Sequence, residues 1–79
     1  MTPVQCRAAR GLLRWSIVRL SGLTDVPTSA ISKFEVGAKP LTGGRQDVIR
    51  AALEAAGVIF VAENDEGPGL SLRKERASG

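Results

Sequence analysis

The stretch from Trp15 to Gly37, WSIVRLSGLTDVPTSAISKFEVG, constrains the fold more than any other part of this chain. Apolar side chains recur in it at helical spacing, in two segments too short to be stable alone. Thr24 and Asp25 separate them, and Asp tolerates the left-handed backbone of a tight turn better than most residues. We therefore expect two short helices that pack together across a turn. The residues expected to fill their interface are Leu20, Thr24, Val26, Ile31 and Phe34.

Capping residues define the ends of the predicted helices. Thr2 and Gln5 form a capping box around a proline, and Ser16 is a good N-cap for the second helix. Pro27 presets the backbone at the start of the third helix, and Gly37 is its C-terminal stop. The helices are predicted over residues 3–13, 17–23, 28–36 and 45–56, with Gly43 and Gly44 in a flexible loop.

Apolar residues spaced four apart predict which face of each longer helix is buried. This spacing selects Val4, Ala8 and Leu12 in the first helix, and Val48, Ala52 and Ala56, with Ile49 and Leu53 beside them, in the fourth. Ile17 and Val18 precede the expected core residue Leu20, so at least one of them must face solvent or a partner. Trp15 and Phe34 are interpreted as core residues, and Cys6 as a small, partly buried apolar residue.

The hydrophobic period changes after Gly57. A run rich in β-branched residues, a stretch of turn residues and a run of period two follow in that order, which predicts a β-hairpin over residues 58–73. The polar tail, residues 74–79, is expected to be disordered. We therefore predict a mostly α fold in which residues 1–57 form four short helices and the hairpin completes the same domain.

The predicted hairpin also bears on oligomeric state. A two-stranded hairpin is marginally stable in water and has unpaired edges. Two hairpins that join across a two-fold axis would remove both problems, so we predict a homodimer through residues 58–73, with help from the fourth helix. The competing arrangement is a monomer whose hairpin folds back on its own helices.

The charge of the chain is uneven. The 79 residues carry a formal net charge of +3, enough to favour a polyanionic partner. Residues 1–39 hold six basic and two acidic side chains, whereas residues 40–79 hold five basic and six acidic ones. The cation excess therefore lies in the same half as the predicted two-helix unit.

Composition argues against most catalytic and metal chemistry. With one cysteine and no histidine, the chain can form neither an internal disulfide nor an ordinary zinc site, and no Ser-His or Cys-His pair is possible. We expect no enzyme activity, no cofactor and no metal. No stretch resembles a signal peptide or a membrane span, so the cytoplasm is the expected compartment.

The central stretch resembles a known family. The residues that carry the resemblance are Trp15-Ser16, Leu20, Val26, Ser29, Ile31, Phe34-Glu35, Gly37 and the run RAALEAAGV that ends at Val58. They are similar to the Cro/C1-type (XRE family) helix-turn-helix transcriptional regulators, in particular short bacterial members with a C-terminal β-hairpin. The resemblance spans roughly residues 2–73. It implies a lambda-repressor-like DNA-binding domain over residues 1–57 whose third helix reads the major groove of double-stranded DNA, commonly as a homodimer.

The resemblance also assigns residues. Thr28, Ser29 and Lys33 match the family's base-reading positions, and Ser32 is a candidate phosphate or base-edge contact. Arg19 and Lys39 are candidate contacts to the DNA backbone or else solubilising charges, and the first amides of the fourth helix could bind one phosphate. Arg10 and Glu35 match a family pair that forms a structural ion bridge between the first and third helices.

Two departures from the family leave the function open. The family usually has Gln where this chain has Ile17, and the Gln amide contacts a phosphate; the usual turn glycine is Asp25 here. Either DNA contact is weaker, or this chain has changed partner. The first hypothesis is a sequence-specific DNA-binding repressor, which includes an antitoxin that represses its own operon. The alternative is a protein-interaction module, or an antitoxin-like partner of a toxin, on a helix-turn-helix scaffold.

Overall fold

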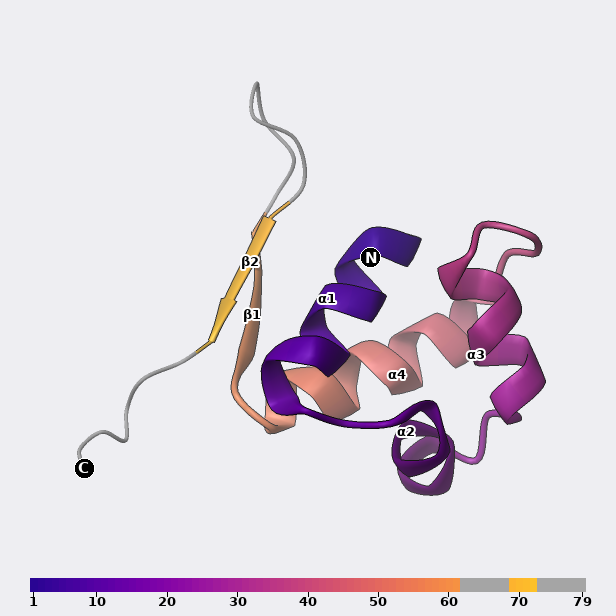
Figure 1. Cartoon of the computed structure of the whole chain (residues 1–79), viewed down its shortest axis with the longest axis horizontal. Helices are drawn as coiled ribbons and strands as arrows, with labels where there is room; N and C mark the ends of the chain where they lie inside the picture. Colours follow the sequence, from indigo (N-terminus) through magenta and orange to yellow (C-terminus); the bar gives the residue numbers. More distant parts are fainter. Residues whose placement is uncertain (62–68, 73–79) are drawn as a thin grey trace.

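The structure of the protein, a computed structural model, describes residues 1–61 and 69–72. The elements in chain order are α1 (Pro3–Leu13), α2 (Ile17–Thr24), α3 (Thr28–Glu35), α4 (Gly43–Ala55), β1 (Val58–Val61) and β2 (Gly69–Leu72). The prediction of a mostly helical chain is confirmed. The helices gather into one cluster, with the two strands on the side of α1 away from α3 (Figure 1). The tip of the predicted hairpin and the predicted tail lie outside the described residues.

Side-chain hydrogen bonds cap the N-terminal ends of α1 and α2. The Thr2 amide donates to Gln5 Oε1 at 2.9 Å and the Gln5 amide donates back to Thr2 Oγ1 at 3.1 Å, which completes the predicted capping box. Ser16 Oγ accepts a hydrogen bond from the Arg19 amide at 3.0 Å. These bonds satisfy amide groups that have no partner within the helix itself.

The start of α4 differs from the prediction. The helix begins at Gly43, two residues before the predicted start, so Gly43 and Gly44 form its first turn and are not a flexible loop. The reason is Thr42, whose extended backbone and Oγ1 cap the helix by accepting from the Arg45 amide at 3.3 Å. The cost of glycine in a helix is lowest in such a first turn, where few intrahelical bonds depend on it.

Four turns use backbone of positive φ, one of them at Gly57 after α4, with φ 111°. Asp25, which follows α2, has φ 61°, as its side chain suggested, and Gly37, which follows α3, has φ 78°. Arg14, at the end of α1, has φ 58°, which no sequence signal indicated. The left-handed Arg14 lets the chain reverse at once, so that Trp15 and Ser16 lead directly into α2.

The core is aliphatic, with one aromatic ring. Its buried side chains are Cys6, Ala9, Leu20, Val26, Ile31, Phe34, Leu41, Ile49, Leu53 and Val58. Four of the five residues predicted for the α2–α3 interface are buried in it. The fifth, Thr24, is only half-buried, because its Oγ1 donates to the Leu20 carbonyl at 2.7 Å and accepts from the Val26 amide at 3.3 Å. Thr24 therefore closes the turn and does not fill the core. Trp15 is half-buried and packs at the margin.

The predicted buried face of α1 is wrong. Val4 and Leu12 are 70% and 45% exposed, and Ala8 is exposed as well. The inward residues are Gln5, Cys6 and Ala9. The rotation follows from the polar contacts of α1, because Cys6 and Arg10 are one turn apart and both bind Glu35 of α3. Their shared direction fixes which side of α1 faces inward.

The predicted stripe of α4 is also wrong in part. Val48 is 46% exposed, and the fully buried residues are its neighbours Ile49 and Leu53. The two long side chains bury more apolar surface than the alanines of the stripe, and this difference decides the rotation of the helix.

The two strands pair antiparallel, with Val58 opposite Leu72 and Phe60 opposite Leu70. Along β1 the side chains alternate: Val58 is buried, Ile59 is 44% exposed and Phe60 packs against the core. The Arg50 guanidinium of α4 lies over the Phe60 ring at 5.1 Å. The sheet therefore packs on helices of its own chain, and Ile59 faces away from them.

Candidate nucleic-acid interface

The outward face of α3 carries four of the predicted DNA-contact residues: Thr28, Ser29, Ser32 and Lys33. All four are exposed, and their spacing forms two pairs four residues apart, Thr28 with Ser32 and Ser29 with Lys33. Ile31 and Phe34, on the other side of the same helix, are buried. The burial of one side of α3 thus turns its hydroxyl and ammonium groups outward together.

A nearly buried ion pair holds α3 against α1. Arg10 donates from Nε to Glu35 Oε2 and from Nη2 to Glu35 Oε1, both at 2.7 Å. The side chains of Arg10 and Glu35 are 17% and 4% exposed. The remaining Arg10 nitrogen, Nη1, donates to the Trp15 carbonyl at 2.9 Å, which ties the start of α2 to the same pair. The hydrogen-bonded carboxylate raises the pKa of the Arg10 guanidinium above its ordinary value.

Cys6 belongs to this buried cluster and is not a reactive thiol. Its Sγ donates to Glu35 Oε2 at 3.3 Å. Burial raises the pKa of the Cys6 thiol to about 12, and the hydrogen bond and the charge of Glu35 add to the rise. Since the thiolate is the nucleophilic form, the group is inert near neutral pH and acts as a hydrogen-bond donor.

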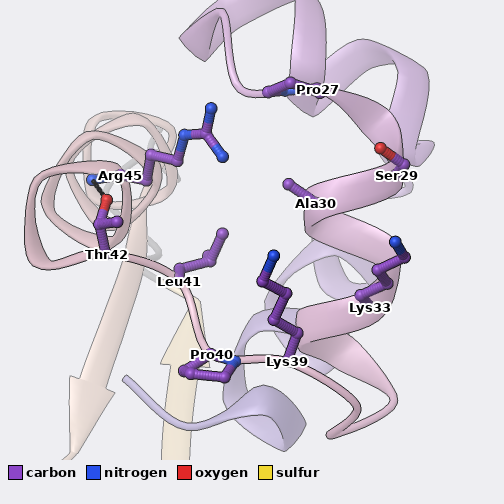
Figure 2. A pocket seen from close by; sticks show the side chains of 9 residues that line it. All are labelled: Pro27, Ser29, Ala30, Lys33, Lys39, Pro40, Leu41, Thr42 and Arg45. Atoms are coloured by element: carbon purple, nitrogen blue, oxygen red, sulfur yellow. Dashed lines mark hydrogen bonds between the residues drawn. The ribbon is translucent and has the colours of Figure 1, made fainter.

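A groove of about 270 Å³ lies between α3, the segment that follows it and the start of α4. It is lined by Pro27, Ser29, Ala30, Lys33, Lys39, Pro40, Leu41, Thr42 and Arg45. Figure 2 shows the Lys39 and Arg45 side chains extending into the space between α3 and α4, with Lys33 on the α3 side. Three cations from three different segments therefore surround one groove.

The turn after α3 brings these cations together. Gly37 reverses the chain, and the amides of Ala38 and Lys39 both donate to the Lys33 carbonyl, at 2.8 and 3.3 Å. Leu41, which is 8% exposed, then anchors the chain in the core. The backbone of Lys39 is consequently held beside the last turn of α3.

None of these three cations is neutralised within the described part of the chain. The ion pairs there are Arg10 with Glu35 and Arg50 with Glu54, and neither includes Lys33, Lys39 or Arg45. Like charges that are held close together without carboxylate partners repel one another. The described surroundings of the groove are therefore positively charged.

The start of α4 borders the groove through Thr42 and Arg45 and has backbone donors of its own. Thr42 Oγ1 accepts from the Arg45 amide, whereas the amides of Gly43 and Gly44, as in the first turn of any α-helix, have no acceptor within the helix. The first turn of α4 contains no acidic residue. This end of α4 therefore has the positive end of a helix dipole that no acidic side chain of its first turn offsets.

Arg45 is the charged groove residue that was not among the predicted DNA-contact residues. A cation in the first turn of a helix opposes the helix dipole and is unfavourable for the helix alone. This unfavourable position of a cation, just after two glycines, is the sequence signal that could have indicated a functional role for Arg45.

The structure does not bring Arg19 to this groove. The Arg19 guanidinium lies over the Trp15 ring at 5.2 Å. Together with Leu23 these residues border a separate shallow pocket at the other end of α4, where Ala52, Ala55 and Ala56 form the floor. Arg19 is therefore placed for packing against Trp15, and not for contact with a ligand of the groove.

The two apolar residues that begin α2 have different environments. Ile17 is half-buried and packs against the core, so it stabilises α2 where the family pattern has a polar Gln. Val18 is 71% exposed. This outcome matches the expectation that at least one of the two faces solvent or a partner.

No group of histidine, cysteine and carboxylate side chains that could hold a metal ion occurs among the described residues. None of the described helices combines the length and hydropathy that crossing a bilayer requires. No protein-family model matches the chain, and neither does any curated protein.

Proposed function

We propose that this protein is a sequence-specific, double-stranded-DNA-binding transcriptional regulator, most simply a repressor, that places α3 in the major groove. The observation that carries the proposal is the set of unneutralised cations around the groove, Lys33, Lys39 and Arg45, directly beside the polar outer face of α3. Phosphate contacts supply affinity and base contacts supply specificity. The groove cations and the polar outer face of α3 together offer both kinds of contact.

The residues divide into two roles. The exposed hydroxyls of Thr28, Ser29 and Ser32 can donate to or accept from base edges, and Lys33 can reach a guanine edge or a phosphate. Lys39 and Arg45, with the first amides of α4, would hold a phosphate of the adjoining strand. An α-helix of ordinary diameter fits the major groove, so docking α3 requires no change in the fold.

The arrangement of α2 and α3 supports the proposed relation to the Cro/C1-type, lambda-repressor-like regulators. The two helices are joined through Asp25 in left-handed conformation, and α3 is held to α1 by the Arg10–Glu35 pair that the resemblance implied. We extend the proposal to a homodimer through the β1–β2 hairpin, because paired half-sites give a small reading helix sufficient affinity. A regulator of this kind would act in the cytoplasm, where its DNA lies.

Selection from a library of random duplexes tests the proposal. The full chain should enrich a motif of two related half-sites about one helical turn apart. Lys33→Ala should relax one position of that motif if Lys33 reads a base, or weaken all sequences alike if it binds phosphate. A folded protein that enriches no motif would contradict sequence-specific binding.

Val18 favours a second candidate, a protein-interaction module or an antitoxin-like partner of a toxin, with weakened DNA binding. A β-branched side chain that is 71% exposed at the start of α2 gains nothing from DNA phosphates but can pack against a protein. Val18→Ser separates the two candidates. The substitution should leave DNA affinity unchanged if α3 and the groove make the contacts, and it should weaken a complex that α2 forms with a protein.

A further inference from the structure

The outer face of α1 is apolar although the helix is packed in the fold. Val4 and Leu12 are 70% and 45% exposed, with Ala8 between them on the same face. Gly11 adjoins this stripe, and a Cβ built on it would meet no heavy atom within 4 Å. We refer to Val4, Ala8, Gly11 and Leu12 as the α1 stripe. It offers a partner contiguous apolar surface and, at Gly11, close approach to the backbone.

The described charged side chains of α1 beside the α1 stripe are all basic. Arg7 and Arg14 are exposed, and neither has an ion-pair partner among the described residues. The third arginine of this region, Arg10, is occupied by Glu35. No acidic residue precedes Asp25 in the sequence, so nothing on α1 or α2 offsets these cations.

We propose that the α1 stripe binds an acidic, amphipathic helical segment of another protein. Apolar side chains of that segment would cover Val4, Ala8 and Leu12, while its carboxylates would pair with Arg7 and Arg14. This occupant matches both the apolar surface and the uniform positive charge, as in the known docking of amphipathic helices on complementary surfaces.

Other occupants match less well. A second copy of α1 would bring Arg7 and Arg14 against their own counterparts with no carboxylate between them, which is unfavourable. DNA would be attracted by the arginines but would gain nothing from Val4 and Leu12. The surface is small, since a helix of this length is only about 16 Å long, so the complex should be weak and reversible.

The test uses the full, isotope-labelled chain and two synthetic peptides. The first is a helix-forming peptide of about 15 residues with Leu at helical spacing and Glu at the flanking positions, and the second has Lys in place of every Glu. The acidic peptide should shift the amide resonances of α1 in a saturable way, and the basic peptide should not. Arg7→Glu should weaken the acidic peptide about tenfold, because like charges then face each other.

Matched variants separate this inference from the proposed DNA binding. Lys33→Glu is the same charge reversal on the groove, and it should leave the peptide affinity unchanged while it weakens DNA binding. Leu12→Gln should weaken the peptide without changing DNA affinity. Equal binding of both peptides, shifts outside α1, or no saturable shift would overturn the inference. An Arg7→Glu variant that loses as much DNA affinity as Lys33→Glu would also overturn it, since Arg7 would then belong to the DNA-binding surface.

Discussion

Glu35 of α3 accepts both arms of the Arg10 guanidinium of α1, with 2.7 Å from Nε to Oε2 and 2.7 Å from Nη2 to Oε1. The same carboxylate accepts a hydrogen bond from the Cys6 thiol, and the same guanidinium donates one to the Trp15 carbonyl. One nearly buried pair thus connects α1, α3 and the start of α2. The orientation of the outer face of α3 depends on this connection.

Removing one member of the pair should cost more than removing both. Arg10→Met leaves the Glu35 carboxylate, 4% exposed, without its charge partner, and should lower the free energy of unfolding by about 3 kcal/mol or more. The double variant Arg10→Met/Glu35→Met should lose less stability than Arg10→Met alone, because it leaves no unpaired buried charge. Denaturant unfolding at neutral pH measures all four proteins, and strictly additive losses would show that the pair is not coupled.

Cys6 should make the folded state less stable at high pH. Its pKa rises from an ordinary value of 9.0 to about 12 on folding, so between these values the folded chain holds a proton that the unfolded chain has released. Titration of Cys6 leaves the free energy of unfolding unchanged below pH 9.0. Between that pH and about 12 the free energy of unfolding falls by about 1.4 kcal/mol for each pH unit. The difference between wild type and Cys6→Ala isolates this effect from other titrations. A difference in unfolding free energy that does not change with pH over that range would contradict it.

The hairpin should mediate self-association. Val58 is a core residue, so a chain that ends at Gly57 would lose stability as well as the sheet. Ile59→Lys is the better variant, because Ile59 is 44% exposed and faces away from the helices. We expect sedimentation to find a dimer at micromolar concentration for the wild type and a weakened one for Ile59→Lys. If the wild type sediments as a monomer over this range, the hairpin serves only to cover its own helices.

Local signals predicted the helices well because caps act over three or four residues. Thr2 with Gln5, Ser16 and Gly37 each placed a helix end correctly. They failed at α4, where the cap is Thr42 and the expected glycine loop is its first turn. There, the two glycines were predicted as a loop, although the preceding residue, Thr42, is a good N-cap.

The rotation of α1 could not be predicted from periodicity. Spacing of four residues selects Val4 and Leu12, but Cys6 and Arg10 have the same spacing on another side of the helix. Only the position of Glu35, which is distant in sequence, decides between them. The groove could not be predicted from periodicity either, because Lys33, Lys39 and Arg45 come together only through the chain reversal at Gly37.

The central claim is that the cations around the groove, Lys33, Lys39 and Arg45, contact DNA and that at least Lys39 and Arg45 bind its phosphates, and salt dependence tests it most directly. The affinity of the full chain for a duplex should fall linearly on logarithmic axes as salt rises. In Lys33→Ala/Lys39→Ala/Arg45→Ala the slope should become shallower by about 2–3, since each phosphate contact contributes about 0.9. Arg50→Ala is the matched control, because Arg50 pairs with Glu54 and lies over Phe60, away from the groove, and its slope should equal that of the wild type. An unchanged slope in the folded triple variant, or binding by the wild type that salt does not weaken, would contradict the claim.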